Sequence, residues 1–185
     1  MHKEPWQNYY MNGQPVDAPY VQGTPMPDGQ QIGVATIFLW RQNEGGGGQQ
    51  VLLQTRNENL RLWPGYLDVS AAGHLDFGEQ PLEAALREMH EELGLEISAD
   101  DLAFIGTLPL INSWPTPPEP ELHFVYAYKI EKDLQTSFSD QEVTAVDWYN
   151  INDVIHAVKD GHLKLAKADS PLFDFSLLAI KKLAI

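Results

Sequence analysis

The segment from Gly73 to Leu95 constrains the fold of this chain more than any other part of its sequence. Pro81 suits the first turn of a helix, and Gly94 suits the left-handed position that commonly ends one. The spacing therefore predicts a helix over residues 81–93. On a helix that turns by about 100° per residue, its apolar side chains share one sector and are expected to face the core: Leu82, Leu86, Met89 and Leu93.

A second sector of the same predicted helix carries three carboxylates, those of Glu88, Glu91 and Glu92. Positions three and four apart are neighbours on a helix surface, so these carboxylates repel one another unless a positive group lies among them. Mg²⁺ meets this need because it is a hard cation that takes oxygen ligands and shares its coordination sphere with substrate phosphates. The alternative is a solvated helix face rich in glutamate, which composition alone would favour.

The charge of the chain restricts its partners. The formal net charge is −14 at pH 7, and such a surface repels nucleic-acid backbones and anionic membranes. We therefore expect a small-molecule substrate, and neither a nucleic acid polymer nor a membrane as a partner. A phosphate-bearing substrate would need cations supplied locally, and a metal ion at the helix glutamates would supply them.

Residue types that are missing exclude other chemistry. The chain contains no cysteine, which excludes disulfides, thiolate metal sites and a cysteine nucleophile. The first residues lack the apolar stretch of a signal peptide, and no apolar run approaches the length of a transmembrane helix. We therefore expect a cytoplasmic protein.

Composition divides the chain into an N-terminal extension, residues 1–30, and a single domain, residues 31–185. The extension is rich in Pro, Gly, Asn and Gln and carries several aromatic residues. It is expected to form a loose hairpin laid over the domain or over a partner subunit, and the second case implies a homodimer.

Apolar and β-prone runs predict strands at residues 32–40, 51–56, 104–110, 122–130 and 143–149. Helices are predicted over residues 152–158 and from Ser170 to the C-terminus, the second with Phe175, Leu178 and Leu183 as its apolar positions. Strands interleaved with helices, without a regular βαβ rhythm, favour an α/β fold with a mixed sheet between helices.

The whole segment matches a defined pattern, G-x5-E-x7-R-E-U-x-E-E-x-G-U, in which U is an apolar residue. Its constrained positions are Gly73, Glu79, Arg87, Glu88, Met89, Glu91, Glu92, Gly94 and Leu95. The chain thus resembles the Nudix hydrolase family. The resemblance implies a Nudix α/β/α sandwich with a mixed β-sheet. It also implies a hydrolase that cleaves a diphosphate linkage in a nucleoside diphosphate derivative or a similar compound.

The same resemblance implies roles for these residues. The three helix glutamates bind Mg²⁺, with Mn²⁺ as an alternative, and the backbone carbonyl of Ala72 assists them. Glu79 and Arg87 form a structural ion pair, although Arg87 would otherwise suit a surface contact with another helix glutamate. Gly73 and Gly94 are expected to serve backbone geometry, and His90 is expected to be solvated.

The pair Gly73-His74 is similar to the isopentenyl-diphosphate isomerase branch of this superfamily. The similarity extends to residues 63–65, 119–121 and 140–143. In that branch the histidine and two glutamates with this spacing bind a metal, so His74, Glu119 and Glu121 are candidate ligands or supports of ligands. The alternatives are a hydrogen-bonded structural role for His74 and a solvated position in a proline-rich loop for Glu119.

Catalysis needs a general base as well as a metal. In the family this base lies either in the helix segment or in a later loop, which makes Glu121 and Glu142 candidates beside the helix glutamates. Glu121 is therefore a candidate both for metal binding and for catalysis. An ordinary solvated loop position is the alternative for Glu142.

The chain departs from the isomerase branch at two places. Ala72 stands where isomerases carry an essential cysteine, and residues 30–33 lack their metal-binding histidines. These differences predict a hydrolase related to the isomerases. Isomerisation of an allylic diphosphate and a catalytically silent nucleotide or metabolite sensor are the alternatives. Four aromatic residues are candidates for covering the second half of the substrate, with core packing as the alternative: Trp63, Tyr66, Trp114 and Phe124.

Overall fold

A computed structural model describes residues 5–43, 45–112, 119–131, 135–137, 142–168 and 170–183. The helices are α1 (Pro81–Leu93), α2 (Ile151–Asp160), α3 (Leu172–Leu183) and the short 3₁₀ helix η1 (Ala99–Asp101). The long strands are β4 (Gln30–Gln42), β5 (Gln49–Arg56), β8 (Leu102–Asn112), β9 (Glu119–Lys129) and β10 (Val143–Asn150). The short strands are β1 (Pro5–Trp6), β2 (Asn8–Tyr10), β3 (Tyr20–Val21), β6 (Leu67–Asp68) and β7 (Ala71–His74).

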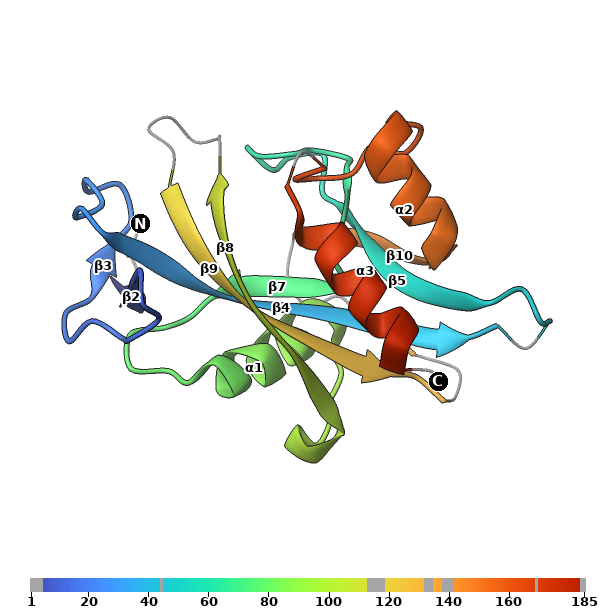
Figure 1. Ribbon diagram of the computed structural model, residues 1–185, viewed down its shortest axis with the longest axis horizontal. Helices are drawn as coiled ribbons and strands as arrows, with labels where there is room; N and C mark the ends of the chain where they lie inside the picture. The colour runs from blue at the N-terminus through green and yellow to red at the C-terminus, as the bar shows by residue number, and fades with distance from the viewer. Residues whose placement is uncertain are drawn as a thin grey trace.

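A mixed sheet lies between α1 on one face and α2 and α3 on the other (Figure 1). Its long strands follow the order β10-β5-β4-β9-β8, and the short β2, β6 and β7 pair with β4 or β5. Strands β4 and β9 run parallel, whereas the other pairs of this sheet are antiparallel. The predicted α/β/α sandwich with a mixed sheet, and its predicted long strands, are confirmed.

Strand β4 lies at the centre of the molecule. It pairs with other strands along both edges, and it carries apolar side chains on both faces. Successive side chains of a strand point to opposite faces. Phe38 and Trp40 accordingly enter the core beneath α2 and α3, while Ile37 and Leu39 enter the core beneath α1. One strand therefore contributes side chains to the cores on both sides of the sheet. It also pairs with β7 and with β9.

Helix α1 begins and ends as the sequence predicts. Pro81 occupies the first turn, Glu83 Oε2 accepts a hydrogen bond from Gln80 N at 3.0 Å, and Gly94 ends the helix with φ 68°. The predicted core face is confirmed in part: Met89 and Leu93 are buried, while Leu82 and Leu86 are half-buried and pack against the same core. The buried face is rotated from the predicted one and consists of Ala84, Ala85, Glu88, Met89, Glu92 and Leu93.

The three apolar residues noted for α3 lie outside its fully buried face, although Phe175 packs against the core. Leu178 and Leu183 are 51% and 48% exposed, and Phe175 is half-buried. The buried face consists of Leu172, Phe173, Ser176, Leu177 and Ile180. The helix is apolar on several sides, so its pattern does not identify the inward side; contact with the sheet does. Phe173 packs edge-on against Phe38 with ring centroids 5.9 Å apart.

The N-terminal segment is hydrogen-bonded into the large sheet. Strand β2 pairs with the start of β4, and Gln7 N donates to Leu75 O at 2.8 Å. Tyr9 and Tyr20 are buried within the same chain, whereas Tyr10 is 46% exposed. Burial of these two tyrosines thus requires no second subunit. The domain boundary near residue 30 and the homodimer stay predictions.

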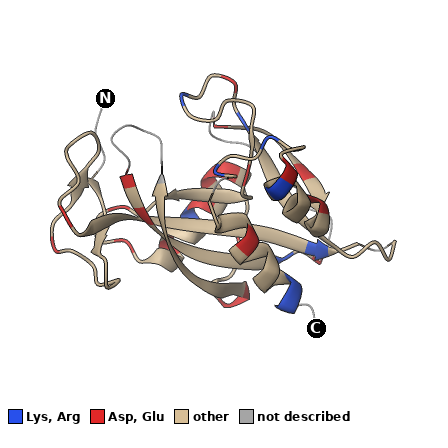
Figure 2. Ribbon diagram, turned by 45° about the horizontal axis from the view of Figure 1, so that its top comes forward, with Lys and Arg blue, Asp and Glu red and all other residues tan. Residues whose placement is uncertain are grey.

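Charged side chains are unequally divided, with 26 acidic and 12 basic residues in the sequence. Figure 2 shows acidic residues spread over strands, helices and loops, with Lys and Arg at fewer, scattered positions. Any site for a phosphate-bearing molecule must therefore gather its cations locally. Among the described residues, no helix is both long and apolar enough to cross a membrane.

Candidate functional site

A cavity of about 530 Å³ lies beside α1, between β7 and the loop that precedes α3. Nine of the predicted site residues line it: Ala72, Gly73, His74, Arg87, Glu88, Glu91, Glu92, Glu121 and Glu142. Three predicted residues lie outside its lining, namely Glu79, Gly94 and Glu119. The structure therefore brings most of the candidate set to one place.

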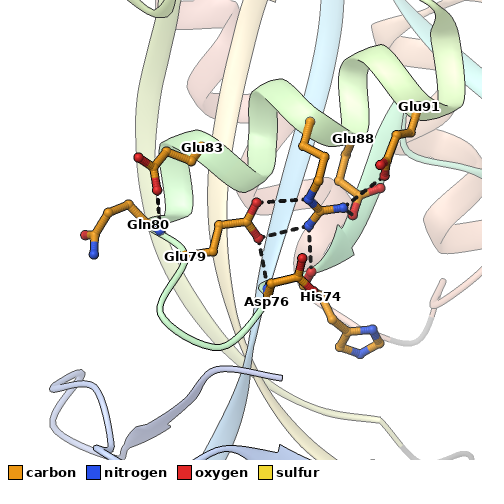
Figure 3. A network of polar contacts seen from close by, with 8 residues as sticks. His74, Asp76, Glu79, Gln80, Glu83, Glu88 and Glu91 are labelled. Atoms are coloured by element: carbon orange, nitrogen blue, oxygen red, sulfur yellow. Dashed lines mark hydrogen bonds and ion pairs between the residues drawn. The ribbon is translucent and has the colours of Figure 1, made fainter. Parts of the chain in front are cut away.

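Arg87 lies at the centre of the acidic network, where it contacts Glu79, Glu88 and Glu91, the carboxylates labelled in Figure 3. Its Nε and Nη2 donate to the two carboxylate oxygens of Glu79 at 2.9 and 3.0 Å, a bidentate pair. Its Nη1 donates to Glu88 Oε1 at 2.6 Å and to Glu91 Oε2 at 3.0 Å. A further bond from Nη2 to His74 O, at 3.0 Å, ties α1 to β7.

Charges in this network shift the ionisation of its carboxyl groups. Burial alone would raise the pKa of Glu79, but hydrogen bonds from Arg87 and from Asp76 N hold that pKa below its ordinary value. Burial raises the pKa of Glu88 above its ordinary value, against the opposing effect of Arg87. The two carboxylates thus respond differently to one guanidinium because Glu88 is the more deeply buried.

The two pattern glycines serve different needs. Gly94 adopts the left-handed conformation that ends α1. Gly73 shows no left-handed conformation; a Cβ at this position would instead overlap the Glu88 carboxylate. Gly73 therefore provides space in which the glutamate lies against β7.

Glu92 is buried and held from two sides. Its Oε2 accepts hydrogen bonds from Ala72 N at 3.1 Å and from Gln54 Nε2 at 3.4 Å. Gln54 Oε1 is buried and has no hydrogen-bond partner within the described residues. Gln54, which was not identified from the sequence, therefore belongs to the cavity lining and contacts one of the helix glutamates.

The donor set of α1 fits a hard divalent cation, since three carboxylates line one cavity and a buried amide oxygen lies beside them. In the described part of the chain, no three His, Asp or Glu side chains stand together as a ready-made metal site. Arg87 instead lies between Glu88 and Glu91. Cation binding therefore requires these two carboxylates to turn from Arg87 toward the cavity, while Glu79 continues to hold the guanidinium.

A second polar cluster surrounds Glu121, near the start of β9. Glu121 Oε2 lies 2.9 Å from His123 Nε2 and 3.5 Å from Lys167 Nζ, and its Oε1 lies 3.8 Å from His74 Nε2. Burial opposes the charge of Glu121, yet Lys167 and the two histidines hold its pKa well below the ordinary value. An ionised carboxylate therefore lies in the wall of the cavity at neutral pH.

His123 is fully buried, and burial lowers its pKa. A neutral imidazole has one N–H, which Nε2 donates to the Glu121 carboxylate. Nδ1 then accepts from the hydroxyl of Thr36, at 2.8 Å. His123 was not identified from the sequence, although its place two residues after Glu121 on a strand puts both side chains on one face.

His74 and Glu119 lie in different surroundings. The His74 ring stacks on Trp6, with centroids 3.8 Å apart and planes 9° apart. Glu119 Oε1 accepts a hydrogen bond from the hydroxyl of Tyr20 at 2.9 Å, outside the cavity lining. Burial, together with this hydrogen bond, raises the pKa of Tyr20 to about 12.

The four aromatic candidates also lie in different places. Trp63 lines the cavity and contacts Tyr66 with ring centroids 5.4 Å apart. Phe124 packs on the core beneath α1, and Trp114 lies outside the described residues. Trp6 and Lys167 also line the cavity and were not identified from the sequence, because each reaches the site from a distant part of the chain.

Known proteins resemble this chain in sequence and in fold. A model of the NUDIX domain matches residues 30–170. The chain is 30% identical over 145 residues to the m7GpppN-mRNA hydrolase NUDT17 of Danio rerio, an alignment that covers 70% of this chain and 44% of that protein. It is 31% identical over 113 residues to the isopentenyl-diphosphate Delta-isomerase of Escherichia coli O7:K1, with 59% of each covered.

The chain thus spans about half the length of these two relatives. Among solved structures, DR0079 from Deinococcus radiodurans has a TM-score of 0.69 at 21% sequence identity. That alignment covers 94% of this chain and 99% of DR0079, so the likeness of fold extends over nearly all of both chains.

Proposed function

This chain belongs to the Nudix family, and on that premise we propose that it is a divalent-metal-dependent hydrolase of a small-molecule diphosphate. The bond cleaved is the phosphoanhydride linkage of a nucleoside diphosphate derivative or a similar compound. The observation that carries this proposal is that the α1 glutamates line one cavity together with Glu121 and Lys167. A cavity with oxygen ligands on one wall and an ammonium on another suits a charged phosphate group.

The residues have distinct parts in the proposed reaction. Glu88, Glu91 and Glu92 hold the metal, with Ala72 beside them in the lining. Bound there, Mg²⁺ or Mn²⁺ would neutralise charge that develops on phosphate oxygens and lower the pKa of the attacking water. Arg87 keeps α1 and β7 together through its bond to the carbonyl of His74.

Glu121 is the proposed general base. Its carboxylate lies in the cavity wall and is ionised at neutral pH, which leaves it able to accept a proton from the attacking water. The lowered pKa makes it a weaker base than an unperturbed glutamate. Glu142 also lines the cavity and is the alternative base. A base in either position would contribute roughly 10²- to 10⁴-fold to the rate.

The experiment that tests the hydrolase is a substrate panel with Mg²⁺ and then with Mn²⁺. The panel contains nucleoside di- and triphosphates, nucleotide sugars, dinucleotides and prenyl diphosphates. We expect metal-dependent release of a phosphate-bearing product from at least one class. Binding without cleavage across the panel would support a sensor instead.

Matched variants test the site itself. Glu91→Gln and Glu92→Gln are expected to abolish metal-dependent turnover while the circular dichroism spectrum stays that of the wild type. Glu96→Gln removes the same charge from an exposed position just beyond α1 and should leave turnover unchanged. Metal-dependent turnover that survives in Glu91→Gln or Glu92→Gln would contradict the assignment.

Isomerisation of an allylic diphosphate is the second candidate. The approach of His74 Nε2 to Glu121 Oε1, at 3.8 Å, favours it, as does the 31% identity to an isopentenyl-diphosphate isomerase. Ala72 weighs against it because no thiol is present in the chain to protonate or deprotonate an allylic carbon. Incubation with isopentenyl diphosphate and Mg²⁺ or Mn²⁺ decides the matter by whether the dimethylallyl isomer forms.

A further inference from the structure

Lys167 lies in the loop between α2 and α3 with an unusual backbone conformation. Its φ is 55°, in the left-handed region that a non-glycine residue seldom adopts. The loop is fastened at both ends: Ala166 N donates to Leu67 O at 2.8 Å, and Ser170 N and Oγ donate to Lys167 O at 2.9 and 2.8 Å. A conformation that the surroundings impose in this way is frequent at functional sites.

Lys167 differs from the two arginines of the cavity lining in how closely carboxylates bind it. Arg56 pairs with Asp68 at 3.1 Å, and Arg87 is bound by three carboxylates. Lys167 makes a longer contact, 3.5 Å from Nζ to Glu121 Oε2, and its side chain is 20% exposed. An ammonium has three donors, so one ion pair of this length leaves it capacity to bind a ligand oxygen.

The position of Lys167 complements the helix glutamates. Glu121 belongs to the sheet, and Lys167 contacts it from the loop between α2 and α3, whereas the glutamates come from α1 on the other layer. A diphosphate carries negative charge on both phosphate groups. A metal at α1 would neutralise one part of it, and the other part needs a cation from elsewhere in the cavity.

We propose that Lys167 forms a phosphate subsite: its ammonium donates to an oxygen of the substrate phosphate group that lies toward Glu121 and His74. The proposal rests on the proposed function for its substrate class, and it adds the residue that binds the second phosphate. Lysine suits this role because it acts as a compact point charge toward phosphate. The subsite is separate from the glutamates that would hold the metal, so its loss should weaken binding rather than remove metal dependence.

The test compares Lys167→Gln with Lys164→Gln, which removes an equal charge from an exposed position in the same loop, outside the cavity lining. The probe is methylenediphosphonate, whose P–C–P link resists hydrolysis, titrated calorimetrically in the presence of Mg²⁺. We expect Lys167→Gln to weaken binding by about tenfold to a hundredfold, the loss typical of one charge-assisted hydrogen bond. Lys164→Gln should bind as the wild type does, and Lys167→Arg should recover part of the affinity. Wild-type affinity in Lys167→Gln, an equal loss in Lys164→Gln, or no recovery in Lys167→Arg would overturn the proposal.

If Lys167 only neutralised the buried Glu121 carboxylate, it would have no effect on ligand affinity once that carboxylate is removed. The double variant Lys167→Gln/Glu121→Gln removes both charges and should regain thermal stability that the single Lys167→Gln variant loses. If Lys167 binds phosphate, the double variant still binds methylenediphosphonate more weakly than Glu121→Gln alone. Equal affinity of these two variants would overturn the subsite.

The same experiment separates the subsite from the proposed reaction. A wild-type protein that cleaves nothing in the substrate panel contradicts the hydrolase, while Lys167-dependent binding of methylenediphosphonate would still support the subsite. With an active enzyme, Lys167→Gln should raise KM by a similar factor and change kcat less. An unchanged KM together with a lowered kcat would overturn the binding role.

Discussion

Gly73 lies so close to Glu88 that a methyl group in its place would overlap the glutamate carboxylate. The contact joins β7 to α1 at the middle of the acidic network, because Glu88 also accepts a hydrogen bond from Arg87. Sequence patterning places a glycine here, but only the fold reveals that the requirement is room for a neighbouring side chain.

Gly73→Ala should therefore displace Glu88 and damage the site. We expect a loss of about 1–3 kcal/mol in the free energy of unfolding, the usual cost of forcing an extra carbon into a packed region, together with a large loss of metal-dependent activity. Urea denaturation and the turnover assay measure the two effects. Gly45→Ala, at an exposed loop position without a left-handed φ, is the control and should be nearly neutral. Wild-type activity in Gly73→Ala would show that Glu88 need not lie against β7.

Glu79 should make the stability of the protein depend on acid pH. Burial opposes its ionisation, but Arg87 holds its folded-state pKa below the ordinary 4.5. The stability that this ionised pair contributes is fully present above the unfolded-state pKa and is lost as pH falls through the folded-state pKa. Glu79→Gln should thus be less stable than the wild type at pH 7, and the difference should shrink as pH falls below the unfolded-state pKa and through the folded-state pKa.

Urea denaturation at a series of pH values measures that difference directly. Glu88 has a raised pKa and contributes with the opposite sign in both proteins. The exposed variant Glu96→Gln should follow the wild type throughout. A gap between wild type and Glu79→Gln that stays constant with pH would contradict the prediction.

The fold was predictable where local signals agree with the tertiary contacts. Pro81 and Gly94 mark the ends of α1, and the long apolar run within β4 identifies the central strand. The inward face of α3 was not predictable, because Phe175 and Leu178 are as apolar as the buried Phe173. Only packing against the sheet distinguishes them.

The same distinction between local signals and tertiary contacts applies to the candidate site. Residues of the loop and α1 were identifiable because their spacing is fixed within one short segment. Trp6 and Lys167 reach the cavity through strand pairing and loop closure over long stretches of chain, and a single sequence contains no local trace of such contacts. His123 falls between these cases, since alternation from Glu121 places it on the correct face.

Gln54 should tune the affinity for metal without supporting the fold. Its Nε2 contacts Glu92, while its buried Oε1 has no hydrogen-bond partner within the described residues. Gln54→Leu removes an unsatisfied polar atom together with the long hydrogen bond to Glu92, two opposing effects, so the melting temperature should change little. Loss of a residue that orients a ligand typically weakens metal affinity by about 10- to 100-fold. Titration of activity with Mg²⁺ measures this change, and Gln42→Leu, at an exposed end of β4, is the control. Unchanged Mg²⁺ dependence in Gln54→Leu would exclude such a role.

Trp6 should connect the N-terminal segment to catalysis, because its indole stacks on the His74 ring and also lines the cavity. Trp6→Ala removes the surface against which His74 is held, and aromatic pairs of this kind contribute about 0.5–1.5 kcal/mol beyond the area they bury. We expect reduced kcat/KM with a modest fall in melting temperature, while Trp6→Phe keeps a stacking ring and should retain most activity. Tyr10→Ala alters a largely exposed aromatic residue of the same segment and serves as the control. If Trp6→Ala and Tyr10→Ala lowered kcat/KM equally, the effect would belong to the segment in general rather than to the stack on His74.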